Sequence, residues 1–167
     1  MVIRGPLGVG KTTVAKRVAR RLRGAYVSID QILEAHDLWD VGALSEFLRA
    51  NDVAVDCAAP FLRAGRPVIF DGNFYWKAQI EDLVGRLEFP YRIFTLAAPL
   101  AVCIERDAGR AAPHGAEAAR KVYAKTIRFD CGTRVDANHP LSNVVENLLL
   151  RLENWVPRSS GRPPSYQ

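Results

Sequence analysis

The stretch that decides the fold is Gly5-Pro6-Leu7-Gly8-Val9-Gly10-Lys11-Thr12-Thr13, which fits the pattern G-x-x-x-x-G-K-[ST] without a mismatch. The apolar run Met1-Val2-Ile3 before it suits a short strand, and Val14, Val18 and Leu22 recur at helical spacing after it. A glycine loop between a strand and a helix gathers backbone N–H groups at the positive end of the helix. The sequence therefore predicts that residues 5–13 bind a nucleoside triphosphate.

Two side chains of this loop have expected roles. Lys11 is expected to contact the β- and γ-phosphates, and the Thr12 hydroxyl to bind Mg²⁺. Glycine is needed because a positive φ and a close approach to phosphate both exclude a Cβ. The alternative is a chance match in a helix-capping loop, but the correct strand and helix flanks are the context that such a motif requires.

Length and composition limit the function classes. The 167 residues predict one domain, and 49% hydrophobic residues suffice for a layered core. A net charge of +5 permits a polyanionic partner without requiring one. The most apolar stretch, 94–104, contains Pro99 and is shorter than the roughly 20 residues that span a bilayer. We expect no membrane partner.

Cysteine usage and the N-terminus predict the compartment. The three cysteines are isolated in the sequence and lack metal-ligand spacing, which is typical of thiols in a reducing compartment. We expect no signal segment, since the predicted first strand begins at Met1. The sequence therefore predicts a cytoplasmic protein.

The first predicted helix, residues 10–23, has a basic side. Its five basic residues are Lys16, Arg17, Arg20, Arg21 and Arg23, and Gly24 is the expected stop. A solvated helix face is favoured over a nucleic-acid patch, because no aromatic residues are interleaved with these charges.

Asp30 follows the predicted second strand, residues 25–29. In an open α/β sheet, ligands bind beyond the carboxyl ends of the strands, so this position is one where chemistry occurs. The alternative is an N-cap for the turn 31–35. Sequence position leaves both interpretations open.

A long helix is predicted over residues 43–64, with a kink at Pro60 and an end at Gly65. In the loop before it, His36 and Trp39 could line an acceptor pocket. Plain packing is the favoured interpretation for such a pair.

Asp71 closes the nearly continuous apolar run 67–73, which is typical of a buried parallel strand. An Asp at this place in a P-loop protein supplies the second magnesium contact, and we favour that role over a turn Asp before Gly72. The aromatic run 74–76 is predicted to open a helix that reaches Leu87. Three consecutive aromatic residues cannot all face the core, so at least one is expected to meet substrate.

A fourth strand is predicted over residues 90–96, and Pro99 suits the first turn of the next helix. On that helix, Arg106 and Arg110 are four residues apart and are expected to share a face. The segment 108–115 is small, polar and interrupted by Gly and Pro, which predicts a mobile loop.

The remaining elements complete the expected domain. A helix is predicted over 117–129, a last strand over 133–137 and an amphipathic helix over 140–152. Residues 1–156 are then expected to form one domain, and residues 157–167 are expected to be a disordered tail.

Strand and helix patterns alternate five times, which favours a parallel sheet covered on both faces. At this point the sequence resembles the small P-loop kinases. That group includes adenylate, shikimate and gluconate kinases, chloramphenicol phosphotransferase, the zeta-toxin type and the kinase domain of polynucleotide kinase. The resemblance covers about residues 1–154. It rests on the loop 5–13, on Asp30, on V-I-F-D-G-N-F at 68–74 and on the helix 99–110 that leads into a basic loop.

The resemblance implies a three-layer α/β/α fold of the P-loop NTPase class. Its sheet would have five parallel strands in the order 2-3-1-4-5, with a LID at about 106–118 after the fourth strand. ATP and Mg²⁺ are the implied cofactors. Asp71 would help Thr12 to hold Mg²⁺, and Asp30 would receive the proton of the acceptor hydroxyl. Arg106 and Arg110 would close over the triphosphate, since the planar guanidinium binds phosphate oxygens in pairs and keeps its charge.

The sequence also departs from individual members. Adenylate-kinase-type enzymes have Pro-Arg shortly after the Asp-Gly of the third strand, where this chain has Asn73-Phe74. This argues against a nucleoside monophosphate as acceptor. The glycine triplet of shikimate kinases is missing as well.

The hypothesis from the sequence is a Mg²⁺-ATP-dependent kinase that phosphorylates a hydroxyl of a nucleoside, sugar or similar small molecule. Its catalytic residues would be Lys11, Asp30, Arg106 and Arg110. The alternatives are a 5′-hydroxyl polynucleotide kinase and a non-enzymatic switch in which ATP orders the LID for a partner. The sequence does not identify the acceptor, ATP or GTP preference, or whether the chain is a monomer or a homodimer. It leaves open whether Asp30 or Asp71 is the base.

Overall fold

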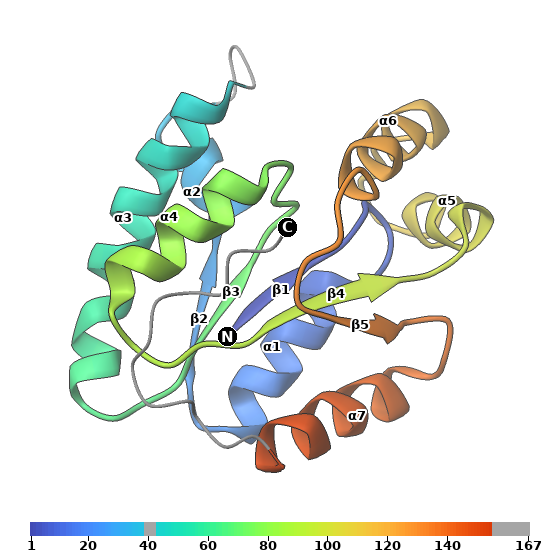
Figure 1. The fold of residues 1–167 in the computed structure, drawn as a ribbon. Helices are drawn as coiled ribbons and strands as arrows, with labels where there is room; N and C mark the ends of the chain where they lie inside the picture. The colour runs from blue at the N-terminus through green and yellow to red at the C-terminus, as the bar shows by residue number, and fades with distance from the viewer. Residues whose placement is uncertain (39–42, 155–167) are drawn as a thin grey trace.

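The computed structural model describes residues 1–38 and 43–154, and at its centre is a sheet of five parallel strands in the order β2-β3-β1-β4-β5 (Figure 1). The strands are β1 (Val2–Arg4), β2 (Ala25–Ser28), β3 (Val68–Asp71), β4 (Ile93–Ala97) and β5 (Thr133–Asp136). Val2 of the central strand lies opposite Phe70 on one side and Ile93 on the other. The predicted sheet order and parallel pairing are confirmed.

Helices cover both faces of this sheet, as expected of an α/β fold. They are α1 (Lys11–Arg21), α2 (Ile29–Ala35), α3 (Leu44–Arg63), α4 (Lys77–Leu87), α5 (Leu100–Ala108), α6 (Ala116–Thr126) and α7 (Leu141–Glu153). Helices α3 and α4 lie on one face, and α1 and α7 lie on the other (Figure 1). Helices α5 and α6 lie together beyond the carboxyl ends of β1 and β4.

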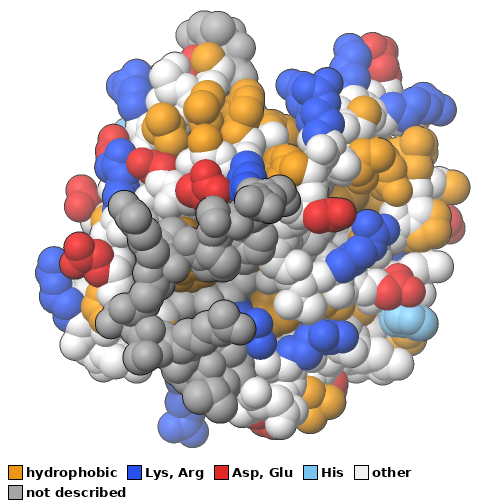
Figure 2. All heavy atoms as spheres, viewed as in Figure 1, with side chains coloured by type: hydrophobic (Ala, Val, Ile, Leu, Met, Phe, Trp, Pro, Cys, Tyr) orange, Lys and Arg blue, Asp and Glu red, His pale blue; other side chains and the backbone are white. Residues whose placement is uncertain are grey.

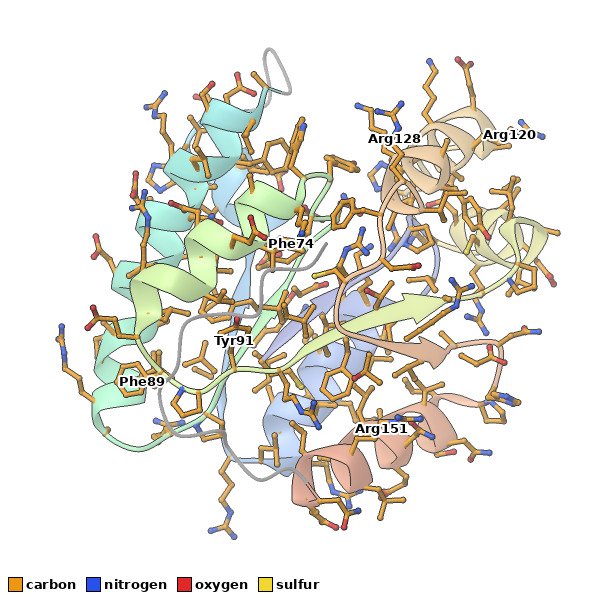
Figure 3. All side chains as sticks on the ribbon, viewed as in Figure 1. Phe74, Phe89, Tyr91, Arg120, Arg128 and Arg151 are labelled. Atoms are coloured by element: carbon orange, nitrogen blue, oxygen red, sulfur yellow. The ribbon has the colours of Figure 1, made fainter. Side chains whose placement is uncertain are left out.

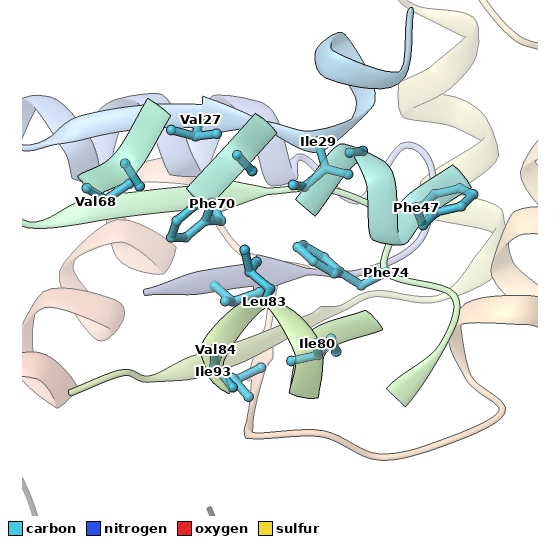
Figure 4. Packing of buried hydrophobic residues seen from close by; sticks show 14 of the residues in the cluster. Val27, Ile29, Phe47, Val68, Phe70, Phe74, Ile80, Leu83, Val84 and Ile93 are labelled. Carbon is cyan, nitrogen blue, oxygen red and sulfur yellow. The ribbon is translucent and has the colours of Figure 1, made fainter. Parts of the chain in front are cut away.

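The apolar side chains of the strands divide between two cores. Val2 and Phe70 pack with α3 and α4, whereas their neighbours Ile3 and Ile69 pack with α1 and α7. Figure 4 shows the first of these cores, with Phe70 beside Leu83 of α4. Each fully buried side chain of this size contributes about 1.5–3 kcal/mol. Burial on both faces is the reason that β3 is an unbroken apolar run in the sequence.

One helix end differs from its sequence prediction, and the end of α3 at Gly65 agrees with it. The left-handed residue that ends α1 is Arg23, with φ 50°, rather than Gly24. Helix α3 continues through Pro60 for one more turn before Gly65 takes φ 70°. The missing N–H of a proline removes a single bond there, and the packing of α3 on the sheet holds the helix together.

The expectation that the aromatic run 74–76 opens a helix is wrong. Helix α4 begins at Lys77, Phe74 has φ 49°, and Trp76 is an extended N-cap. The run is therefore the loop between β3 and α4. The shared helical face of Arg106 and Arg110 is also wrong, because α5 ends at Ala108.

Some predictions lie outside the described residues. These are the pocket role of Trp39 and the disorder of the tail from residue 157. Among the residues that the structure does describe, no helix is long and apolar enough to cross a membrane.

Candidate active site

The loop between β1 and α1 is shaped by glycines at two demanding positions. Gly8 has φ 80°, and a Cβ there would lie 2.0 Å from the carbonyl oxygen of Cys103 in α5. Gly10 has φ 97° and is the N-cap of α1, with open space where a Cβ would be. The first glycine is therefore required by packing as well as by backbone conformation, and the second by conformation alone. The loop therefore packs against α5 at Gly8, and α1 begins directly after Gly10.

Lys11 is the first residue of α1, and only 8% of it is exposed. Its Nζ donates to the Pro6 carbonyl oxygen at 3.0 Å, so the side chain turns back across the loop. Burial lowers the pKa of Lys11, and the nearby carboxylates of Asp71 and Asp30 oppose this shift. A cation held in this way is available to the phosphates of a bound nucleotide.

Asp71 is the last residue of β3 and is buried. Its Oδ2 accepts hydrogen bonds from the Thr12 hydroxyl at 2.7 Å and from the Tyr26 hydroxyl at 3.0 Å. Burial and the charge of Asp71 raise the pKa of Tyr26 to about 12, which keeps this hydroxyl a donor. The Oδ1 atom of Asp71 has no hydrogen-bond partner among the described residues.

The Thr12 and Asp71 oxygens suit Mg²⁺. This ion takes oxygen ligands and is usually held by one or two carboxylates together with waters and substrate phosphates. A buried carboxylate oxygen without a partner beside a hydroxyl is such a partial donor set. The described residues contain no cluster of three or more His, Cys, Asp or Glu that could hold a metal by itself. The site therefore fits a magnesium ion that arrives with a nucleotide.

Asp30 lies in the first turn of α2, immediately after β2. The N-cap of α2 is Ser28, whose hydroxyl accepts from the Gln31 N–H at 3.3 Å. The alternative that Asp30 is an N-cap is therefore wrong. Its Oδ2 accepts from the side-chain amide of Asn73 at 3.3 Å. Burial raises the pKa of Asp30; the Lys11 charge opposes this shift and the Asp71 charge adds to it.

The aromatic run beside Asp30 divides between core and surface. Phe74 is fully buried against α3 and α4, as Figures 3 and 4 show. Tyr75 and Trp76 are half-buried, and each meets the ring of Phe47 edge-on, at centroid distances of 5.7 and 5.0 Å. Burial and the charge of Asp30 raise the pKa of Tyr75. The half-buried aromatic surface thus adjoins the Asp30 carboxylate.

The two predicted LID arginines have different partners. Arg106 reaches from α5 to both sides of the loop, since its Nη1 donates to the carbonyl oxygens of Val9 at 3.4 Å and Ala137 at 2.9 Å. Arg110 lies beyond α5, with its Nη1 3.6 Å from an oxygen of Asp107. The charge of Arg110 also lowers the pKa of Lys11, so this guanidinium is within electrostatic reach of the nucleotide loop. His36, in contrast, is exposed at the other end of α2 from Asp30.

The glycine loop, Lys11 and the Thr12–Asp71 pair thus assemble at the carboxyl ends of β1 and β3. The protein family described as AAA domain matches residues 1–129. This chain belongs to the AAA domain family.

Solved structures share the fold of this AAA domain chain. A gluconokinase from Sinorhizobium meliloti 1021 is 17% identical, covers 91% of this chain and 90% of its own, and superposes with a TM-score of 0.72. A sugar kinase from Janibacter sp. HTCC2649 is 18% identical, with coverage of 91% and 92% and a TM-score of 0.72. A shikimate kinase from Aquifex aeolicus vf5 is 17% identical, with coverage of 91% and 95% and a TM-score of 0.58. The fold is therefore that of the small P-loop kinases. A search of curated protein sequences gives no significant match.

Several residues of the AAA domain site were not singled out from the sequence as functional. Tyr26 and Asn73 meet Asp71 and Asp30 only through the fold, whereas Asp107 meets Arg110 three residues along the chain. Arg4 could have been predicted to have a specific partner, because it is a charged residue in an otherwise apolar central strand. Charges are rarely buried without such a partner.

Proposed function

We propose that this AAA domain protein is a Mg²⁺-ATP-dependent kinase that transfers the γ-phosphoryl group to a hydroxyl of a small molecule. The observation that carries the proposal is the position of Asp30. It is not used as a helix cap, it is held by Asn73, and it lies within electrostatic reach of Lys11. The names gluconokinase, sugar kinase and shikimate kinase of the structures with this fold support a small hydroxyl compound as acceptor.

The residues of the loop would hold the nucleotide. The backbone N–H groups of 5–13 and the Lys11 ammonium would bind the phosphates, and the Thr12 hydroxyl and Asp71 would hold Mg²⁺. When bound, Mg²⁺ neutralises charge on the β- and γ-phosphate oxygens. Phosphoryl transfer needs little covalent help from a protein, so alignment and charge neutralisation supply most of the catalysis.

Asp30 would orient the acceptor hydroxyl and take its proton. Two hydroxyl groups already donate to Asp71, which suits a carboxylate at a metal rather than a base. The Oδ1 atom of Asp30 has no hydrogen-bond partner among the described residues, which leaves its lone pairs for the acceptor. A raised pKa also brings Asp30 closer to the operating pH, where general-base catalysis is most efficient.

Arg106 and Arg110 would complete the site when the LID, residues 106–118, closes over the triphosphate. Arg106 already bridges the loop and the segment after β5. Arg110 would exchange Asp107 for phosphate oxygens, a partner with more negative charge. Closure would also exclude water, which competes with the acceptor for the phosphoryl group.

The test is transfer of labelled γ-phosphate from ATP to pools of nucleosides, sugars, amino acids and 5′-hydroxyl oligonucleotides. Wild type is compared with Asp30→Asn, and with Glu34→Gln as an exposed carboxyl control on the same helix. We expect label in one small-molecule pool, lost in Asp30→Asn and retained in Glu34→Gln. Label only in free phosphate, equal in all three proteins, would contradict the proposal and favour an ATP-dependent switch.

One feature favours a second candidate, a kinase that acts on the 5′-hydroxyl end of a nucleic acid. Basic side chains gather over α6 in Figure 2, and Figure 3 labels Arg120 and Arg128 among them. Lys125 of the same helix lies 5.1 Å from the ring centroid of Tyr75, beside the proposed acceptor site. Label in the oligonucleotide pool would support this candidate.

A further inference from the structure

Helix α6 is attached to the protein in an unusual way. It packs mainly on α5, beyond the edge of the two cores (Figure 1). Of its eleven residues, Ala119 and Thr126 are buried. Tyr123 adds one hydrogen bond to the Ala98 carbonyl oxygen at 3.2 Å. Tyr123 also packs against the core on the α1 and α7 face, and the polar attachments of the two helix ends add to this contact.

The N-terminal end of α6 is held by Asp107 of α5. This carboxylate is 1% exposed, and its Oδ2 accepts the backbone N–H groups of His114 at 3.0 Å and Gly115 at 2.9 Å. Gly115 is the N-cap of α6 and has no side chain with which to cap it. Asp107 therefore caps the helix from another element, and its negative charge lies at the positive end of the helix dipole.

The C-terminal end of α6 is held by Arg4 of β1. This guanidinium is fully buried and donates to the carbonyl oxygens of Thr126 at 2.7 Å and Phe129 at 3.3 Å. It also lies 4.2 Å from the centroid of the Phe129 ring. A positive charge at the carbonyl end of a helix is again the favourable sign. The two ends are thus fastened by buried charges of opposite sign.

Arg4 also joins α6 to both halves of the proposed site. It precedes Gly5 of the nucleotide loop, and it donates to the Phe74 carbonyl oxygen at 3.5 Å, one residue after Asn73. A further bond reaches the Thr95 hydroxyl of β4 at 3.2 Å. Arg4 would therefore transmit a shift of the nucleotide loop (residues 5–13), or of the loop after β3 (residues 72–76), to the end of α6.

We propose that Asp107 and Arg4 are positioning residues that fasten the two ends of α6, so that closure of the LID is coupled to the positions of the nucleotide loop (residues 5–13) and of the loop after β3 (residues 72–76). The proposal rests on the proposed function, because α6 carries the end of the LID. Breaking either attachment would leave nucleotide binding largely intact. It would loosen the segment 109–126 and admit water to the phosphoryl group.

The first experiment does not depend on activity. Deuterium exchange of the amides in 109–126 is measured for wild type, Asp107→Ala and Asp107→Asn, with and without Mg²⁺ and a non-hydrolysable ATP analogue. Glu117→Gln is the control, since this exposed carboxyl lies in the first turn of α6 itself. We expect exchange roughly tenfold faster in Asp107→Ala, because two hydrogen bonds to a charged group are lost. Asp107→Asn should exchange close to wild type, since one amide oxygen can accept both N–H groups.

Exchange in Asp107→Ala equal to wild type would overturn the proposal, and so would Asp107→Asn as fast as Asp107→Ala. Binding of the analogue should slow exchange over 109–126 in wild type and in Glu117→Gln. The same slowing in Asp107→Ala would also contradict the coupling.

The second experiment tests Arg4 with Arg4→Lys, which keeps the charge but lacks the fork that reaches three segments. Arg17→Met, an exposed site on α1, is the control. We expect ATP affinity within about threefold of wild type and a ratio of ATP hydrolysis to transfer roughly tenfold higher in Arg4→Lys. An unchanged ratio together with unchanged exchange would overturn the role of Arg4. Should Arg4→Lys fail to fold, the Asp107 variants still decide whether α6 is fastened. Wild type that transfers no phosphate would refute the proposed function, whereas the exchange experiment would still decide the inference.

Discussion

Lys11 and Asp30 lie close enough for the charge of each to shift the pKa of the other. Both pKa values are displaced toward the neutral form because both groups are buried. Perturbed groups of this kind concentrate at functional sites, where a charge is kept out of water until a ligand compensates it. Removing either charge should therefore change the chemistry of the site directly.

Replacing Lys11 with Ala removes the buried ammonium from the phosphate site. We expect a loss of roughly 10²–10³-fold or more in kcat/KM for ATP, the range found when one electrostatic donor is removed from an active site. Lys16→Ala, on the exposed side of the same helix, is the matched control and should keep its activity. A loss below tenfold in Lys11→Ala would show that the nucleotide does not bind as proposed.

Asp30 predicts the pH dependence of transfer. A base must be deprotonated to act, so activity falls as pH falls through its pKa in the folded protein. Burial raises that pKa above its ordinary value of 3.8, so the acid limb of the kcat/KM profile should lie above pH 3.8. Asp30→Asn should lose about 10²–10⁴-fold in transfer and lose this limb, with nucleotide binding retained. The same limb in wild type and variant would assign it to another group.

Two elements, the nucleotide loop and α5, meet at Gly8. A Cβ at Gly8 would strike the Cys103 carbonyl oxygen, whereas one at Gly10 would meet open space. We expect Gly8→Ala to lower the free energy of unfolding by about 2 kcal/mol or more, through overpacking and backbone strain together. Gly10→Ala carries strain alone and should cost about 1 kcal/mol. Denaturant unfolding measures both, and equal losses would contradict the contact with α5.

The proposed LID carries two arginines whose contacts differ. Arg106→Ala removes bonds to two loops, whereas Arg110→Ala releases a side chain paired only with its neighbour Asp107 on the described surface. Both should lower transfer, by roughly tenfold or more, and raise the share of ATP that is hydrolysed by water. Product analysis by thin-layer chromatography measures the two rates together. If neither changes in either variant, these arginines do not close over the phosphates.

The whole molecule has a net charge of +5. The salt dependence of KM therefore distinguishes the two classes of acceptor, small molecules and nucleic acids. A small acceptor bound at Asp30 should change its KM by less than about threefold between 50 and 200 mM salt, since few phosphates are involved. A nucleic acid that follows the basic side of α6 would lose affinity steeply, by as much as 10³–10⁵-fold if six to ten phosphates were contacted. The slope of KM against salt for the best acceptor in each pool is the measurement. A steep slope for the preferred acceptor would replace the small-molecule proposal with the second candidate.

The sequence by itself determined the layers and the nucleotide loop of this protein, and its resemblance to the small P-loop kinases implied the sheet order. The pattern at 5–13 is local, because nearly all its ligand groups are backbone N–H groups within one loop, and the loop's shape follows from its glycines. Strand β3 was visible because burial on both faces requires an unbroken apolar run, here residues 68–70. Asp30 and Asp71 could be predicted near the site because each lies at the carboxyl end of its strand, and parallel strands bring those ends together.

The tertiary structure decided which side chains those residues meet. Tyr26 and Asp71 are far apart in the sequence and meet only in the folded chain. The aromatic run 74–76 was predicted to be helical, but Phe74 has a left-handed backbone and packs between α3 and α4. The attachment of α6 by Arg4 and Asp107 has the same origin, since both contacts join groups from different elements. The periodicity and composition of the sequence predict which face of an element is buried. Hydrogen bonds between residues more than a hundred positions apart, such as Arg4 and Thr126, form only when the chain folds.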